Sequence, residues 1–204
     1  MKLYYAPGAC SLSPHIVLLE AGAKFDLAEV EFPSKDTSDG KNLLAINPKG
    51  AVPALQLDNG DVLTEGAVIV QYIADQAGNT TLAPAAGTKE RLKVQEWLNY
   101  IASELHKGFS PLFNPATPDA YKAIVKANLA KQFAYLDKTL AGKDYLTGNN
   151  FTVADAYLFT ILNWRHKHNI DISAYKNLSA YLDRVGARPK VKEAMQSEGL
   201  LVAA

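Results

Sequence analysis

The stretch from residue 47 to residue 75 constrains the fold of this chain more than any other segment. It opens with a turn, Asn-Pro-Lys-Gly, which is followed by Val52-Pro53, an X-Pro bond that a tight turn can hold in the cis form. Residues 54–57 and 62–64 have the composition of two short strands, and Asn59-Gly60 between them is a strong hairpin signal. The segment therefore predicts a hairpin that is introduced by a proline.

A helix is expected to follow this hairpin directly. Thr64 can cap it, Glu65 lies in its first turn, and apolar residues suit its buried side. These are Ala67, Val68, Ile69, Ile73 and Ala74. The free N–H groups and the positive dipole end of a helix N-terminus favour negative charge. We therefore predict that a small anionic ligand binds where the hairpin meets the helix.

The residues before this stretch predict a strand, a helix and a second strand. Residues 2–5 are an aromatic and apolar strand, and Ala6-Pro7-Gly8 ends it. Ser11 or Ser13 can cap the helix, which Gly22 stops, and residues 25–31 alternate as a second strand. A strand-helix-strand unit implies a parallel pair. Residues 42–46 form a short helix at most. The element order is then βαβαββα, which predicts an α/β thioredoxin-like domain over residues 1–79.

Residues 80–87 have the composition of a linker, and residues 88–204 predict only helices. The expected helices are 89–109, 120–140, 152–168, 178–185 and 189–197, with Pro111 beyond the end of the first. The buried side of the first is expected to hold Leu92, Val94, Gln95, Leu98, Ile101, Ala102 and Leu105. The predicted architecture is thus an α/β domain followed by an all-α domain.

The segment 151–156 predicts the start of a helix. Thr152 at the N-cap with Asp155 three residues later is a variant of the capping box, in which Asp replaces the usual Glu or Gln. Phe151 can pack on Ala156 as a hydrophobic staple. We interpret this motif as a folding element.

Charge and hydropathy exclude several classes of function. The 204 residues include 21 basic and 21 acidic ones without a basic stripe, so nucleic acid and membrane partners are not expected. The N-terminus reaches proline and glycine before any apolar run, so we expect no signal peptide, and no apolar stretch approaches the ~18 residues of a membrane span. The single cysteine cannot form an intrachain disulfide. We expect a soluble, cytoplasmic protein.

The chain resembles the cytosolic glutathione transferases over essentially its whole length, most closely their bacterial beta class. The most specific features are Ala9-Cys10-Ser11, Val52-Pro53 followed by Thr64-Glu65, and Asn-Phe-Thr-Val-Ala-Asp at 150–155. The resemblance implies glutathione as co-substrate without a cofactor, a small hydrophobic electrophile, and a homodimer. Helices 89–109 and 120–140 would form the dimer interface.

Cys10 is the first candidate catalytic residue. It lies where a strand gives way to a helix N-terminus, which lowers the pKa of a thiol, although a lone cysteine is more often buried and inert. The resemblance implies that Cys10 lies beside the glutathione sulfur and can form a mixed disulfide with it. Tyr5 and Ser11 are alternative hydroxyl donors to the thiolate. The competing interpretations are that Tyr5 is an aromatic of the core and that Ser11 is a plain helix cap.

The resemblance also implies a set of glutathione ligands. Glu65 would pair with the γ-glutamyl amine. The family usually has Ser at the next position, where its hydroxyl and amide bind the γ-glutamyl carboxylate. Here Gly66 keeps the backbone donor and lacks the hydroxyl. Val52, ahead of Pro53, would pair its backbone with the cysteinyl part, and Lys35 would reach the glycine carboxylate.

His106 is the most informative histidine. Asn99, Ser103 and His106 fall at i, i+4 and i+7 on one predicted helix face, which on its own is usually just solvated. The resemblance brings His106 and Lys107 against Cys10, and Glu104 toward the site of a second subunit. The imidazole could stabilise a thiolate.

An apolar electrophile pocket is expected between the domains. Phe109, Leu112, Phe113, Tyr157, Leu158 and Trp164 are possible lining residues, of which we select Phe113 and Trp164. His166 and His168 at i and i+2 point to different helix faces, so we predict no metal site, and His15 is expected to be structural.

Two functions remain at this point. The first is a glutathione transferase that binds glutathione as the thiolate and conjugates it to small apolar electrophiles, with thiol-disulfide exchange at Cys10 as a further activity. The second is a non-catalytic protein that binds glutathione or apolar ligands on the same fold, which Gly66 slightly favours. Cys10, Glu65 and His106 favour the enzyme.

Overall fold

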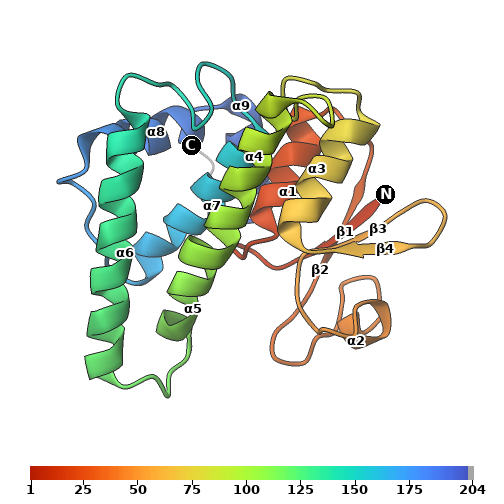
Figure 1. Cartoon of the computed structure of the whole chain (residues 1–204). Helices are drawn as coiled ribbons and strands as arrows, with labels where there is room; N and C mark the ends of the chain where they lie inside the picture. Colours follow the sequence, from red (N-terminus) through yellow and green to blue (C-terminus); the bar gives the residue numbers. More distant parts are fainter. Residues whose placement is uncertain (202–204) are drawn as a thin grey trace.

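The computed structural model describes residues 1–201 of the chain and consists of an α/β domain packed against a helical domain (Figure 1). The α/β domain contains, in order, β1 (Lys2–Tyr5), α1 (Leu12–Glu20), β2 (Asp26–Glu29), α2 (Leu43–Ile46), β3 (Ala54–Gln56), β4 (Val62–Thr64) and α3 (Gly66–Gln76). The sheet order is β2-β1-β3-β4, with β1 parallel to β2 and the other pairs antiparallel. This confirms the predicted βαβαββα order and the thioredoxin-like fold.

The sheet separates two apolar layers because successive side chains of a strand point to opposite faces. On β1, Leu3 and Tyr5 join the main core with α1 and α3, whereas Tyr4 packs with Ala28 and Leu43 on the other face. The small domain is therefore covered on one face by two long helices and on the other by α2 and its loops.

The helical domain contains α4 (Lys89–Tyr100), a π-helical turn (Ile101–His106), α5 (Lys107–Phe113), α6 (Asp119–Leu140), α7 (Val153–Lys167), α8 (Lys176–Gly186) and α9 (Pro189–Ser197). α7 runs through its centre and packs on α1 of the other domain (Figure 1). The linker that we propose at 80–87 lies between α3 and α4.

The prediction for the first long helix was wrong in two respects. It continues past residue 109 to Phe113 with Pro111 inside it, and its middle widens into a π-helix. A proline inside a helix removes a backbone hydrogen bond and crowds the preceding turn. The packing of α5 on α6, and of Phe109 and Phe113 on Trp164 of α7, offsets that cost. The π turn also changes which residues share a face, because one turn contains more residues than in an α-helix.

Burial differs from the prediction at three positions. Leu92 is 59% exposed and Val68 is 50% exposed, and Gln95 is also exposed. Val94, Leu98, Ile101 and Leu105 are buried as predicted. The exposed apolar side chains lie on α3 and α4, and others follow on α6.

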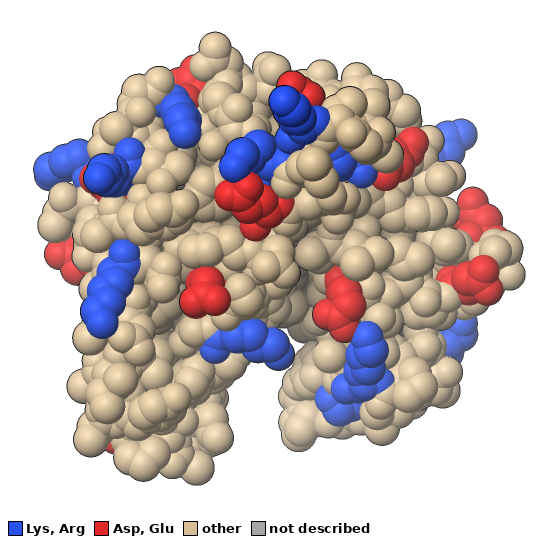
Figure 2. All heavy atoms as spheres, viewed as in Figure 1, with Lys and Arg blue, Asp and Glu red and all other residues tan. Residues whose placement is uncertain are grey.

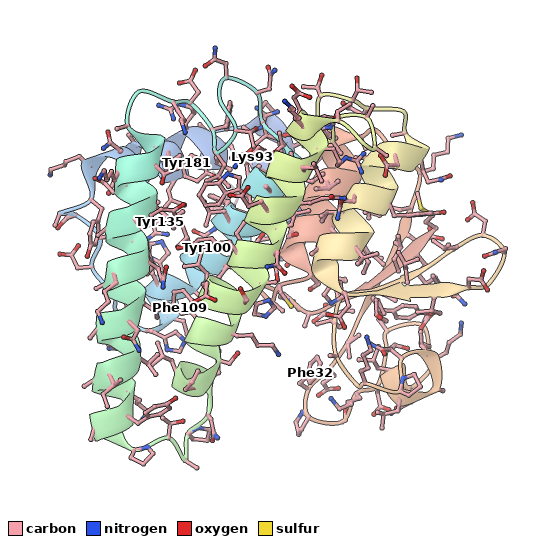
Figure 3. All side chains as sticks on the ribbon, viewed as in Figure 1. Phe32, Lys93, Tyr100, Phe109, Tyr135 and Tyr181 are labelled. Carbon is pink, nitrogen blue, oxygen red and sulfur yellow. The ribbon has the colours of Figure 1, made fainter. Side chains whose placement is uncertain are left out.

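An aromatic cluster joins α4 and α6. Tyr100 and Tyr135 face each other between these helices (Figure 3), with ring centroids 5.5 Å apart, and Trp97 packs edge-on against Tyr100. The Tyr100 hydroxyl donates to the side-chain carbonyl of Gln132 at 2.5 Å. This cluster closes one edge of the helical domain.

The predicted capping box at the start of α7 is confirmed. The backbone N–H of Thr152 donates to Asp155 Oδ2 at 2.8 Å, and the Thr152 hydroxyl donates to the same oxygen at 2.9 Å. The structure adds two donors from outside the motif, because the Leu146 N–H and the Tyr181 hydroxyl both bond Asp155 Oδ1. Asp155 is fully buried, and burial raises the pKa of its carboxyl.

Candidate active site

A cavity of about 800 Å³ lies between the two domains. Its wall combines the loop before α1, the π-helical turn, α5, α7 and the chain after α9. The molecule is deeply notched between the domains, and basic side chains lie on both sides of the notch (Figure 2). Cys10 and His106, which are 96 residues apart in the sequence, share the cavity wall.

Cys10 lies just ahead of α1, on a loop that is fixed by Ser11. The Ser11 hydroxyl accepts from the Ala6 N–H at 3.1 Å and donates to the Ala6 carbonyl at 3.2 Å, and the Cys10 thiol donates to the Val52 carbonyl at 3.2 Å. Burial raises the pKa of Cys10 to about 11, against the opposing effect of the nearby backbone amides. The prediction of a lowered pKa is therefore wrong, because the desolvation of Cys10 outweighs the effect of the backbone amides at the helix end.

This pKa leads to a testable prediction. At neutral pH the Cys10 thiol is protonated, so we expect slow alkylation by iodoacetamide whose rate keeps rising with pH beyond ~8.5, the pKa of an ordinary cysteine. The chain has a single cysteine, so mass spectrometry of the intact protein follows this site alone. A rate that levels off below pH ~8 would contradict the raised pKa.

The structure does not bring the two candidate hydroxyl donors into the cavity. Tyr5 is buried, its hydroxyl donates to Glu29 Oε2 at 3.5 Å, and burial followed by the Glu29 charge raises its pKa. Ser11 is fully buried and its hydroxyl is engaged by Ala6. Ser11 occupies the N-cap position of α1 without a side-chain cap bond, so the prediction that a serine hydroxyl caps this helix was also wrong for Ser11.

His106 ends the π-helical turn and shares the cavity wall with Cys10. Its Nδ1 lies 2.6 Å from the Tyr157 hydroxyl. Its ring packs edge-on against Trp164, with the ring centroids 5.0 Å apart. Burial, followed by the Lys107 charge, lowers the pKa of His106 to about 4. The imidazole is therefore neutral at pH 7. Tyr157, considered above only as possible lining, is its hydrogen-bond partner.

The predicted polar face around His106 is not a single face. Asn99 and Ser103 are exposed, as is Glu104 one step round the helix, and none of the three lines the cavity of this chain, whereas His106 does. The Ser103 hydroxyl donates to Glu104 Oε1 at 3.1 Å. Within one chain these three residues are surface residues.

The predicted glutathione ligands lie together around the hairpin. The Val52-Pro53 bond is cis, and Lys35, which has a φ of 67°, donates from Nζ to the Gly50 carbonyl at 2.6 Å. Phe32 lies at the edge of the notch (Figure 3), and Lys35 Nζ stands over its ring, 4.5 Å from the ring centroid.

The junction between β4 and α3 differs from the prediction. Glu65, with a φ of 69°, occupies the N-cap position, and Thr64 ends β4 instead of capping the helix. The Glu65 carboxylate pairs with Lys49 Nζ at 2.6 Å, and this hydrogen bond lowers its pKa. A Cβ on Gly66 would lie 3.8 Å from Pro53 Cγ, an ordinary contact, so the backbone here leaves room for a Cβ. Lys49 was not among the predicted site residues, because no motif of its own marks it.

The two residues selected for the electrophile pocket both line the cavity. The rings of Phe113 and Trp164 meet edge-on, with their centroids 4.9 Å apart. The Trp164 indole N–H donates to the Gly8 carbonyl at 2.9 Å. The unselected candidates Phe109, Leu112, Tyr157 and Leu158 are buried behind this wall. Leu12, Met195 and Leu200 also line the cavity, and their positions follow only from tertiary packing.

The part of the chain that the structure describes contains neither a candidate metal cluster nor a candidate membrane span. Among residues 1–201, no group of three or more His, Cys, Asp or Glu side chains could hold a metal ion. His15 is buried and lies 2.8 Å from Glu198 Oε1, in the core as predicted. In the same part of the chain, no helix is long and apolar enough to cross a membrane.

Comparison with known proteins identifies the family. The glutathione S-transferase N-terminal domain model matches residues 8–76, and the C-terminal domain model matches residues 100–189. Glutathione S-transferase GstA of Escherichia coli O157:H7 is 46% identical over 200 residues, which cover 98% of this chain and 100% of the relative. The chain belongs to the glutathione S-transferase family. This confirms the resemblance stated above and the prediction of an enzyme.

Further relatives of this transferase agree in sequence and in structure. Glutathione S-transferase GST-4.5 of Xanthomonas campestris is 37% identical over 98% of this chain and 100% of its own length. A ternary complex of BphK, a bacterial transferase, has a TM-score of 0.96 at 52% identity, and a sphingomonad transferase complexed with glutathione has 0.95 at 46%. Each covers 98% of this chain and 100% of the neighbour. A Sphingomonas chungbukensis transferase of the bacterial beta class has a TM-score of 0.95 at 45% identity over the same shares.

Proposed function

We propose that this transferase binds glutathione along the cis Val52-Pro53 segment and conjugates its sulfur to small apolar electrophiles. The observation that carries this proposal is the placement of Cys10 and His106, from different domains, on one cavity that also contains Phe113 and Trp164. The peptide part of glutathione lies on the small domain, and the apolar wall of the helical domain holds the electrophile.

The glutathione ligands are assigned by charge and position. The backbone of Val52 pairs with the cysteinyl residue, Lys35 binds the glycine carboxylate, and Glu65 binds the γ-glutamyl amine. The free N–H of Gly66, in the first turn of α3, donates to the γ-glutamyl carboxylate. The 3.2 Å bond between the Cys10 thiol and the Val52 carbonyl supports this assignment, because a cysteinyl residue paired with Val52 would have its sulfur close to Cys10.

Cys10 and the glutathione sulfur have different protonation states in this proposal. The raised pKa keeps the Cys10 thiol protonated at pH 7, so when glutathione binds, the S–H turns from the Val52 carbonyl and donates to the glutathione thiolate. A neutral His106 whose Nδ1 accepts from Tyr157 carries its proton on Nε2 and is a second donor, and Lys107 adds a positive charge nearby. Two neighbouring thiols with separated pKa values allow one to ionise while the other stabilises it.

Conjugation then proceeds by displacement. The thiolate attacks the electrophilic carbon, the carbon–sulfur bond forms, and the bond to a leaving group such as chloride breaks as that group departs with the electron pair. The thiol proton has already gone to solvent. The enzyme contributes thiolate stabilisation and the proximity of the two reactants.

Disulfide exchange at Cys10 is a second activity of the same site. The Cys10 thiolate attacks a glutathione-containing disulfide, a Cys10–glutathione disulfide forms, and the other half leaves as a thiolate. A glutathione thiolate then attacks the mixed disulfide, which releases oxidised glutathione and restores Cys10. This activity requires the small fraction of Cys10 that is ionised.

The proposal also includes a homodimer in the cytoplasm, the compartment in which glutathione is kept reduced. Exposed apolar side chains on α3, α4 and α6 support it, because single monomers rarely leave so many large apolar groups in water on neighbouring helices. They are Val68, Leu92, Tyr121, Ile124 and Tyr135. A partner subunit on this face would cover them and bring Glu104 toward the second site.

The conjugation proposal is tested by kinetics with 1-chloro-2,4-dinitrobenzene and glutathione. We expect saturable turnover above the uncatalysed reaction, and a Trp164→Ala variant is expected to raise KM for the chloroarene about tenfold with little change in KM for glutathione. The removed side chain forms the cavity wall with Phe113, away from the hairpin. Equal changes in both KM values, or no turnover by the wild type, would contradict the division of the site between the domains.

A further inference from the structure

An exposed ion pair occupies the end of the site where the γ-glutamyl group is proposed to bind. Lys49 Nζ lies 2.6 Å from Glu65 Oε1 and 3.0 Å from the Thr64 hydroxyl. The side chains of Lys49 and Glu65 are 58% and 66% exposed, so both charged groups are open to an incoming ligand. An ion pair with this exposure contributes little to stability, so its charges are available for exchange.

The position of Lys49 is set by a rigid turn. The buried side chain of Asn47 accepts from the Lys49 backbone N–H at 3.2 Å and donates to the Ala51 carbonyl at 2.7 Å. The Gly50 N–H bonds the Asn47 carbonyl, and Lys35 holds the Gly50 carbonyl. The turn is therefore fixed from both sides, and it presents the Lys49 ammonium beside the N-terminus of α3.

The charges around the hairpin complement those of glutathione. At neutral pH, glutathione carries a carboxylate at each end and one ammonium group, on the γ-glutamyl end. The hairpin region presents two complementary charged groups, Lys35, which bonds the Gly50 carbonyl, and the Lys49–Glu65 pair. Gly66 provides a backbone donor there and no side-chain donor.

We propose that Lys49 binds the α-carboxylate of the γ-glutamyl group while Glu65 binds its ammonium. This inference rests on the proposed glutathione site and adds a ligand to it. On binding, the zwitterionic end of glutathione exchanges partners with the Lys49–Glu65 pair, so that each charge stays neutralised. A charge-assisted bond from Lys49 supplies the donor that Gly66 lacks.

The competing interpretation has the opposite consequence. If Lys49 only occupies Glu65, it competes with the ligand ammonium for the same carboxylate, and two positive charges repel each other there. Removal of Lys49 would then tighten glutathione binding, whereas in our proposal it weakens binding.

Calorimetric titration with S-methylglutathione separates the two interpretations. Lys49→Met keeps the length of the side chain and removes its charge. We expect the Kd to rise about five- to tenfold, somewhat less than for a buried charged hydrogen bond because the site is exposed. Lys143→Met, which removes the same charge from an exposed loop, is the matched control and should leave the Kd within about twofold.

A second ligand identifies the group that Lys49 binds. The S-methyl analogue in which 4-aminobutyrate replaces the γ-glutamyl residue lacks only the α-carboxylate. We expect the Lys49→Met substitution to change the Kd for this analogue less than twofold. The wild-type protein itself is expected to bind the analogue more weakly than S-methylglutathione. An unchanged or lower Kd of Lys49→Met for S-methylglutathione would overturn the inference, as would equal losses for both ligands. A wild-type chain that does not bind S-methylglutathione at all would instead overturn the proposed function itself.

Discussion

Replacement of Cys10 by alanine is expected to abolish disulfide exchange and to leave conjugation measurable. Exchange requires a protein thiol, and the chain has no second cysteine to substitute for it. Conjugation uses the glutathione sulfur, so Cys10→Ala removes one hydrogen-bond donor to the thiolate. We expect kcat/KM with 1-chloro-2,4-dinitrobenzene to fall about fivefold, which corresponds to one ordinary hydrogen bond of about 1 kcal/mol.

Cys10→Ser provides the matched control because a hydroxyl retains the donor without the disulfide chemistry. We expect this variant to conjugate at close to the wild-type rate and to show no exchange with 2-hydroxyethyl disulfide and glutathione. Equal, large losses of both activities in Cys10→Ala would mean that the sulfur of Cys10 takes part in conjugation itself, contrary to the roles proposed here.

Replacement of Asp155 by alanine is expected to cause the largest loss of stability among single substitutions in the helical domain that spare the cavity. The carboxylate is fully buried and accepts from two backbone N–H groups and the hydroxyls of Thr152 and Tyr181. Alanine leaves these donors buried without an acceptor, and the expected loss is about 3 kcal/mol or more in the free energy of unfolding. The thermal midpoint should fall by roughly 6–12 °C.

Asp119→Ala is the control for this prediction. Asp119 also lies in the first turn of a helix, but it is exposed and pairs only with Lys122 on the surface. We expect this variant to unfold within about 0.5 kcal/mol of the wild type in urea. A similar, small effect for Asp155→Ala would show that the buried network contributes little beyond a single helix cap.

Most of the fold could be predicted because its signals are local. The Asn59-Gly60 turn, the Val52-Pro53 bond and the Thr152–Asp155 capping box each depend on a few neighbouring residues, and all appear in the structure. The π-helical turn could not be predicted in this way, since no motif of a few neighbouring residues marks it. The predicted burial of Leu92 failed because apolar spacing along a helix does not show which neighbouring element covers each position.

The candidate site could be predicted only in part, because some of its features depend on contacts between segments distant in the sequence. The positions of Cys10 and His106 follow from the family resemblance, but the pKa of Cys10 depends on how deeply its loop is buried between domains. The interaction of Tyr157 with His106, the bond from Trp164 to Gly8 and the pairing of Lys49 with Glu65 join segments distant in the sequence. No spacing rule along the chain indicates such contacts.

The central claim, that the cleft holds glutathione as its thiolate, is tested most directly by titration of bound glutathione in the Cys10→Ala variant. This variant contains no protein thiol, so the ultraviolet absorbance of a thiolate reports the ligand alone. We predict that saturating protein moves the apparent pKa of the glutathione thiol clearly below ~8.5, the ordinary value for a cysteine thiol, because His106 and Lys107 stabilise the anion. A bound ligand whose thiol titrates at or above the value measured for free glutathione would contradict the account.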